Sequence, residues 1–403
     1  MERQWPAIGF ETLPWESDPD ALPFISKTQR RKMPSTYEAA VPLLIADRDV
    51  ALPAALTERA SGLLMSLARF DAEQRMRGYD LSAMLLRSES SASSQIESLT
   101  SSARNVALAE LAPDAPHNAQ LIAGNIAAMK SALSLEGPLE VAGILEIHRT
   151  LINRDGVTFG GALRSEQVWV GGSSFSPHGA LYVPPRYERV AAHLDDLVSF
   201  AARDDIPPIT KAAIFHAQLE TIHPFIDGNG RTGRALLHKI LRDEGVLSRV
   251  TLPLSAGLLH DIDAYMAAIA AYQQGNPVAI VEQLISALEL AIVVGGLTAA
   301  KMDSVIEEWK AMITERRGAS IHRLPGVLVE QPVVSIAYLA KRLGITPRAS
   351  LSLVERACEY GILRPLGNRR RGEFFQSDEI VAVLEEISDI QGIRRIVAGK
   401  ASL

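Results

Sequence analysis

Residues 223–234 read HPFIDGNGRTGR and combine a histidine, a carboxylate, a glycine-rich loop and two arginines. Histidine side chains titrate near neutral pH, so His223 could accept a proton from a hydroxyl group. A glycine-rich loop that leads into a helix presents main-chain N–H groups to an anion, and Arg231 and Arg234 would add charge-assisted donors. Asp227, a lone carboxylate beside phosphates, suits Mg²⁺. These residue types predict phosphoryl or nucleotidyl transfer.

Two helices are expected to position this segment. The pattern of residues 209–223 is amphipathic, and the helix should end at His223 because Pro224 disfavours helical backbone at the preceding residue. A second helix resumes over residues 231–245. Each residue alone would fit an ordinary polar corner between two helices, but the complete set at this spacing favours a phosphate site. The segment is not a P-loop, since it lacks the lysine followed by Ser or Thr.

The same twelve residues resemble the signature of the Fic family, H-x-F-x-[DE]-G-N-G-R-x-x-R, and match it at every fixed position. The resemblance implies protein AMPylation, in which AMP moves from ATP to a Ser, Thr or Tyr hydroxyl and pyrophosphate is released. It assigns His223 as the general base, Asp227 as the Mg²⁺ ligand and Arg234 as the partner of the γ-phosphate. The resemblance places these residues at the nucleotide: Gly228, Asn229, Gly230, Arg231, Thr232, Gly233 and Arg234.

A second segment, SSQIES at residues 93–98, resembles the inhibitory helix of that family, [ST]-x-x-x-E-[GN]. Ser93 and Glu97 would lie on one face of a helix. The resemblance implies that Glu97 pairs with Arg234 and so competes with the γ-phosphate. Ser98 departs from the pattern, which has glycine or asparagine there. From the residue pattern alone, the solvated face of a surface helix is the more common interpretation.

Residues 163–185 interrupt the helical pattern. The runs QVWV and ALYV flank a connection rich in Gly, Ser and Pro, and this pattern predicts a β-hairpin. In a chain that resembles the Fic family, such a hairpin is expected to be the flap that holds the target polypeptide by strand pairing. A surface hairpin without that role fits the residue pattern equally well.

The expected fold is mainly α: a Fic-type helical core with a β-hairpin flap, plus a small winged-helix domain. We expect an N-terminal arm at 1–40, a helical region with the inhibitory helix at 41–111 and the catalytic core at 112–300. A linker at 301–325 would precede the winged-helix domain at 326–403. Residues 333–403 hold eleven Lys/Arg and eight Asp/Glu, a net charge of +3. The whole 403-residue chain has a net charge of −6, which argues against coating of nucleic acid by the protein as a whole.

Composition indicates a protein of the cytoplasm. The single cysteine, Cys358, excludes an internal disulfide framework. The N-terminus has no signal-peptide pattern, and the most apolar stretch, residues 290–300, has about half the length of a membrane span. We therefore expect no membrane association. Fic-type chains of this layout often dimerise, so a homodimer is compatible with the resemblance.

Two alternative functions remain open at this point. Removal of AMP from a modified protein would use Glu97 to position a water molecule. A DNA-binding regulator would act through the winged helix, with the arginines at 369–371 on phosphates in the wing. That domain could equally serve as a protein-contact or dimerisation module.

Overall fold

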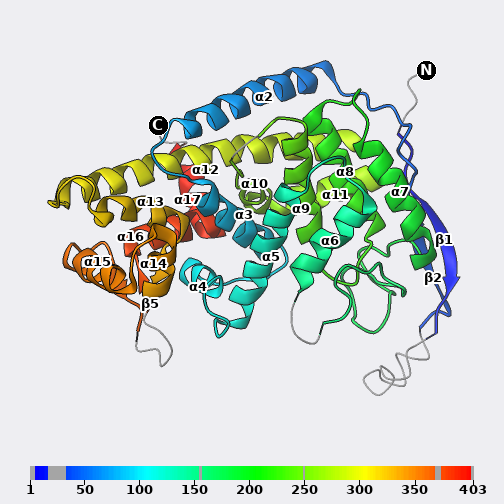
Figure 1. Ribbon diagram of the computed structural model, residues 1–403. Coiled ribbons are helices and arrows are strands. Elements are labelled where there is room, and N and C mark those ends of the chain that lie inside the picture. Colours follow the sequence, from blue (N-terminus) through cyan, green and yellow to red (C-terminus); the bar gives the residue numbers. More distant parts are fainter. Residues whose placement is uncertain (1–4, 17–32, 154–156, 248–249, 368–373, 401–403) are drawn as a thin grey trace. The chain divides into compact units, whose positions relative to one another are not determined.

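The computed structural model describes residues 5–16, 33–153, 157–247, 250–367 and 374–400, and helices dominate it (Figure 1). The mainly helical fold class expected from the sequence is confirmed. The chain divides into two compact units. Unit 1 consists of Met1–Pro53, Ser134–Ile240 and Asp263–Gln283, and unit 2 of Ala54–Leu133, Leu241–Ile262 and Leu284–Leu403.

Unit 1 is organised around α8 (Pro208–Ile222), which packs against α7. Pro208 lies in the first turn of α8, where its missing N–H costs no hydrogen bond. Every residue of α8 from 209 to 219 is buried, so this helix forms the core of the unit. The other helices that lie wholly or mostly in unit 1 are α6 (Val141–Ile152), η2 (Tyr187–Arg189), α7 (Val190–Ala201), α9 (Asn229–Asp243) and α11 (Ile262–Gln273).

The N-terminal arm contains a regular antiparallel pair of strands. β1 (Gly9–Pro14) pairs with β2 (Thr36–Val41), with Gly9 opposite Val41 and Pro14 opposite Thr36. The main-chain N–H of Ala40 donates a hydrogen bond to the Val183 carbonyl (3.0 Å). The arm is therefore attached to the segment in which the sequence predicts a flap.

The two regular strands predicted within 163–185 do not form. This segment holds two isolated bridges, Val170–Tyr182 and Ser173–Ser176. Side chains occupy the carbonyl groups that a strand ladder would use: the Gln167 amide donates to the carbonyls of Val168 (3.0 Å) and Pro184 (2.9 Å). Proline also has no N–H to contribute to a ladder. The chain still reverses direction here, since the Val170 N–H donates to the Tyr182 carbonyl (2.8 Å).

In unit 2 the central helix is α3 (Ser82–Ile96), which contacts α10 (Leu254–His260), α13 (Leu324–Glu330) and α16 (Asp378–Ser388). Its residues are buried from Met84 to Ser94, and their small Ser and Ala side chains allow close packing. The buried Glu89 carboxylate accepts hydrogen bonds from the Ser255 N–H (2.7 Å) and hydroxyl (2.5 Å) at the start of α10. A carboxylate is favourable at a helix N-terminus, so Glu89 joins α3 to α10.

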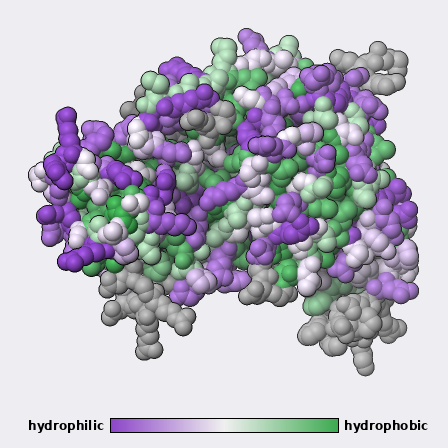
Figure 2. All heavy atoms as spheres, in the orientation of Figure 1, coloured by the Kyte–Doolittle hydropathy of each residue, from purple (hydrophilic) through white to green (hydrophobic). Residues whose placement is uncertain are grey.

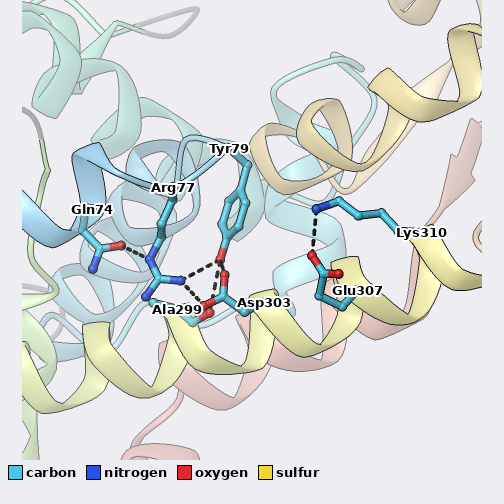
Figure 3. Close-up of polar contacts among 7 residues, drawn as sticks. All are labelled: Gln74, Arg77, Tyr79, Ala299, Asp303, Glu307 and Lys310. Carbon is cyan, nitrogen blue, oxygen red and sulfur yellow. Dashed lines mark hydrogen bonds and ion pairs between the residues drawn. The ribbon is translucent and has the colours of Figure 1, made fainter. Parts of the chain in front are cut away.

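The loop before α3 is attached to the long helix α12 by a polar cluster (Figure 3). The Arg77 guanidinium pairs with Asp303, and the Tyr79 hydroxyl donates to the same carboxylate (2.7 Å). The Gln74 side-chain oxygen accepts from Arg77 (2.9 Å). Burial raises the pKa of the Tyr79 hydroxyl, which keeps it protonated as a donor. These contacts fix the start of α3 relative to α12.

The C-terminal part of unit 2 contains a helix–turn–helix and a three-stranded antiparallel sheet, in which one strand precedes the two helices and two follow them. Gly344 (φ 65°) ends α14 (Ile336–Leu343), and the Thr346 hydroxyl accepts from the Ala349 N–H (3.2 Å) to cap α15 (Pro347–Glu359). The strand order is β3–β5–β4. The strands are β3 (Val333–Ser335), β4 (Arg364–Pro365) and β5 (Phe374–Gln376). Hydrophilic residues are spread over the visible face of the protein, this part included, with apolar residues between them (Figure 2).

The helix α12 (Pro277–Met312) is longer than the apolar stretch at 290–300 suggested, and it includes the first twelve residues of the expected linker. By length and composition, this 36-residue helix could cross a membrane. Half of its most apolar window is buried in the protein, and core helices often have this composition. The remaining helices of unit 2 are α2 (Ala54–Arg75), α4 (Ala103–Ala109), α5 (His117–Ser134), α10 (Leu254–His260), η3 (Ser320–Arg323), α13 (Leu324–Glu330), α16 (Asp378–Ser388) and α17 (Ile390–Lys400).

Candidate active site

His223 lies at the C-terminal end of α8, as the sequence predicts, and adopts the left-handed backbone conformation (φ 51°, ψ 63°). Its N–H donates to the Leu219 carbonyl (2.8 Å), and its side chain is half-buried. For a residue with a Cβ atom this conformation costs roughly 1–2 kcal/mol. Strain of this kind persists where the surrounding structure imposes it, which is common at functional sites.

The loop after His223 is closed by the side chain of Asn229. Its Oδ1 accepts from the Phe225 N–H (2.9 Å), and its Nδ2 donates to the Phe225 carbonyl (2.9 Å). Both ends of the amide therefore help to shape the loop. Phe225 is fully buried.

The first turn of α9 faces this loop. The first hydrogen bond of the helix joins the Thr232 N–H to the Gly228 carbonyl (2.9 Å). The N–H groups of residues 228–231 consequently have no acceptor inside the helix, which makes this end an anion-binding site. Gly228 has φ 83°, a left-handed conformation that favours glycine, and a Cβ atom there would lie 2.9 Å from Leu151 Cδ2. Gly230 is buried in the same turn.

His148 on α6 contacts this loop. The sequence pattern did not identify this residue. Its ring stacks on Phe225 with centroids 3.7 Å apart. Its Nδ1 accepts from the Gly161 N–H (3.0 Å), so the proton is on Nε2, which donates to the Asp227 carbonyl (2.9 Å). Burial lowers the pKa of His148 to about 4, so the ring is neutral near pH 7 and orients the Asp227 main chain.

The Asp227 side chain is 50% exposed and accepts from Arg231 Nη2 at 3.2 and 3.3 Å. Within the described residues, no group of three or more His, Cys, Asp or Glu side chains could hold a metal ion. A single accessible carboxylate beside an anion-binding turn does fit Mg²⁺, which binds nucleotides through few protein oxygens and keeps several waters. Asp227 is the residue that would hold this ion, with phosphate oxygens as further ligands.

The last three residues expected at the nucleotide lie deeper in unit 1. Thr232 is 0% and Arg234 is 1% exposed. Gly233 allows α9 to approach α8, since a Cβ atom there would be 3.0 Å from His216 Nδ1. Burial, with the Arg234 charge as a second cause, lowers the pKa of His216 to about 3. His216 Nε2 lies 2.7 Å from the Tyr265 hydroxyl, a pair that the sequence did not reveal.

Ser93 and Glu97 belong to unit 2, whereas Arg234 belongs to unit 1, so the predicted pairing of Glu97 with Arg234 stays a prediction. Ser93 is 2% exposed within α3, and Glu97 is exposed at its C-terminal cap. Ser98 has φ 60°, and the Leu99 N–H donates to the Ser94 carbonyl (2.9 Å), which is the Schellman geometry. A left-handed residue is needed at this position, which explains why the family pattern has glycine or asparagine there.

Comparison with known proteins agrees with these features. The Fic/DOC family model matches residues 138–241. Protein adenylyltransferase fic-1 of Caenorhabditis elegans is 36% identical over 107 residues, which are 27% of this chain and 20% of that protein. Protein adenylyltransferase Fic of Drosophila grimshawi is 35% identical over 117 residues, 28% of this chain and 22% of that protein. The chain thus spans about a fifth of the length of these relatives.

A crystal structure of a Fic family protein from Desulfovibrio desulfuricans G20 shares the fold. The two chains superpose with a TM-score of 0.53 and 21% sequence identity, over 82% of this chain and 98% of that one. The Fic/DOC family model matches residues 138–241. These residues include His223, the loop closed by Asn229 and the first turn of α9. The part of this chain that is similar to the Fic/DOC family is therefore residues 138–241.

Proposed function

We propose that this protein transfers AMP from ATP to a Ser, Thr or Tyr hydroxyl of a target protein and releases pyrophosphate. One observation carries the proposal: His223 is held in a strained conformation six residues before the start of α9, where the N–H groups of residues 228–231 have no acceptor inside the helix. A proton acceptor and a phosphate cradle are thereby joined by one short, rigid loop. The curated relatives that match this domain are named protein adenylyltransferases.

In the proposed reaction, the target hydroxyl gives its proton to His223 as its oxygen bonds to the α-phosphorus. The bond between the α-phosphorus and the oxygen that bridges the α- and β-phosphates breaks, and the electron pair leaves with pyrophosphate. The main-chain N–H groups of residues 228–231 stabilise the charge on the phosphate oxygens. Asp227 would hold Mg²⁺, and the ion would offset negative charge on the phosphates. Arg234 is proposed to bind the γ-phosphate.

Labelling with ATP tests this proposal directly. The purified protein is incubated with Mg²⁺, a cell lysate and ATP that carries the label either on the α- or on the γ-phosphate. AMP transfer predicts that the protein bands whose labelling depends on the added protein acquire the α-label and not the γ-label. Acquisition of the γ-label would indicate phosphate transfer instead, and no labelling by the wild type or by Glu97→Gly would contradict the transferase assignment.

Inhibition by Glu97 belongs to the same proposal and rests on the pattern at residues 93–98. Replacing Glu97 by glycine is expected to raise the initial rate of labelling by about 10-fold, which corresponds to removal of roughly 1.4 kcal/mol of competition for Arg234. Glu97→Gln is the matched control for the helix end, because it removes the charge and keeps the side-chain size. Both variants should be activated, and equal rates in wild type and both variants would contradict inhibition by this residue.

Removal of AMP from a modified protein is the alternative activity, with Glu97 positioning a water molecule. Release of AMP from a target that has first been modified, measured beside transfer, separates the two. Under the removal hypothesis, Glu97→Gly loses release, whereas under the transfer hypothesis it gains transfer.

The remaining assignments stay proposals: docking of the target on residues 163–185, a homodimer, a cytoplasmic location without membrane association, and contact of residues 326–403 with DNA or protein. The exposed face of α15 carries Arg348 together with Glu355 and Glu359, and Arg356 pairs with Glu315 (3.0 Å). This mixed charge favours a protein contact over DNA. The arginines at 369–371 lie outside the described residues.

A further inference from the structure

Arg164 lies at the start of the 163–185 segment and contacts the catalytic loop with both its main chain and its side chain. Its N–H donates to the Pro224 carbonyl (3.0 Å), and its Nε donates to the His223 carbonyl (2.9 Å). Its Nη1 donates to the Glu166 carbonyl (3.1 Å), and its Nη2 donates to the Pro185 carbonyl. All four of these acceptors are main-chain carbonyl oxygens.

A buried cation in such surroundings is unusual. Arg164 is 3% exposed, and burial lowers its pKa to about 10, so the guanidinium is still charged at neutral pH. Burying a charge is unfavourable unless its hydrogen-bonding groups are satisfied, and the planar guanidinium does this by reaching three carbonyls in different directions. A lysine ammonium, as a single point charge, cannot hold the same three oxygens at once.

These contacts explain how the left-handed conformation of His223 is maintained. The N–H of His223 is fixed by Leu219 and its carbonyl by Arg164, so both of its main-chain polar groups are held. The Tyr182 hydroxyl donates to the Thr221 carbonyl (2.6 Å), which attaches the far side of the same segment to the end of α8. The 163–185 segment is thereby bonded to α8 and the loop on both sides of the histidine.

We propose that Arg164 is a positioning residue: it holds the His223 main chain in the conformation that presents the imidazole, and it couples this conformation to both ends of the 163–185 segment. The inference rests on the proposed AMP transfer. A target polypeptide that docks on this segment would then act on the position of the base through Arg164. The side-chain hydrogen bonds of Arg164 all go to main-chain carbonyls, so we assign it no direct role in the chemistry.

The test compares the full-length wild type, Arg164→Ala and Arg164→Lys, with Arg203→Ala as the matched control. Arg203 also donates to main-chain carbonyls in unit 1, those of Ala46 (3.1 Å) and Arg48 (2.6 Å), but lies away from the loop. We expect kcat for transfer to fall by about 100-fold in Arg164→Ala, as a misplaced reacting group does, while Kd for ATP changes by less than about 3-fold. Millimolar guanidinium should restore part of the rate, and Arg203→Ala should keep wild-type kcat.

A structural readout is independent of activity. In protein labelled with ¹³C at the histidine carbonyls, the His223 resonance is identified by its loss in His223→Asn. This resonance should shift in Arg164→Ala and shift less in Arg164→Lys.

Unchanged kcat with an unshifted resonance would overturn the positioning role. So would an equal loss of kcat and ATP affinity with no guanidinium rescue. If Arg164→Ala does not fold, Arg164→Lys decides by the same criteria. Absence of transfer by the wild type, with the resonance shift present, counts against the proposed function and not against the role of Arg164.

Discussion

Replacing His223 by asparagine is expected to reduce the rate of AMP transfer by about 1000-fold, within the range that a general base contributes. Asparagine is the informative choice because it tolerates the left-handed backbone that His223 adopts. The substitution removes the proton acceptor and keeps the loop conformation, so the loss reports on chemistry. Alanine at this position would add conformational strain to the missing base and would confuse the two effects.

The measurement is the initial rate of label transfer from ATP carrying the label on the α-phosphate, together with the affinity for ATP. His117→Asn is the matched control, since His117 is exposed at the start of α5 and should leave the rate unchanged. We expect the ATP affinity of His223→Asn to stay within a few-fold of the wild type, because the phosphate contacts are proposed to come from residues 228–231 and Arg234. Retention of more than a tenth of the wild-type rate would contradict the role of His223 as the base.

The sequence predicts the local backbone of this segment, because its signals lie within a few residues of one another. Pro224 marks the end of α8, and Gly228 marks the turn into α9. Sequence spacing could not predict the supporting residues. Arg164 and His148 reach the loop from 59 and 79 residues upstream, measured to their main-chain acceptors on His223 and Asp227. A lone arginine in a loop and a lone histidine on an apolar helix face carry no pattern that identifies such contacts.

The departures from the predicted secondary structure also come from contacts between residues that are distant in the sequence. The runs QVWV and ALYV have strand propensity, but the hydrogen bonds from Gln167 to the carbonyls of Val168 and Pro184 replace a ladder. The opposite happens in α3, where the Ser/Glu-rich sequence resembles a solvated surface. That helix is buried because Arg87 and Glu89 find partners on other segments, such as Gln331 (2.6 Å) and Ser255. Tertiary contacts decided both cases.

Replacing Gly257 by alanine is expected to lower the free energy of unfolding by about 3 kcal/mol, the upper part of the range for overpacking a dense core. Gly257 lies in α10, and a Cβ atom there would be 2.5 Å from the Ala287 Cα atom in α12. The obstacle is main chain, so relief requires the two helices to move apart. Because the Glu89 carboxylate binds the first turn of α10, such a movement would also disturb α3.

Gly296→Ala is the control that separates the clash at Gly257 from the general effect of placing alanine in a helix. Gly296 lies on the exposed side of α12, and a Cβ atom added there would meet nothing within 4 Å. Alanine there should stabilise the protein by about 0.5–1 kcal/mol, because glycine loses more backbone entropy in a helix. Thermal unfolding should therefore shift in opposite directions for the two substitutions. Equal midpoints would show that α10 and α12 are not packed as closely as the structure has them. A lower midpoint for Gly257→Ala with increased labelling activity would link this packing to the restraint that α3 is proposed to exert.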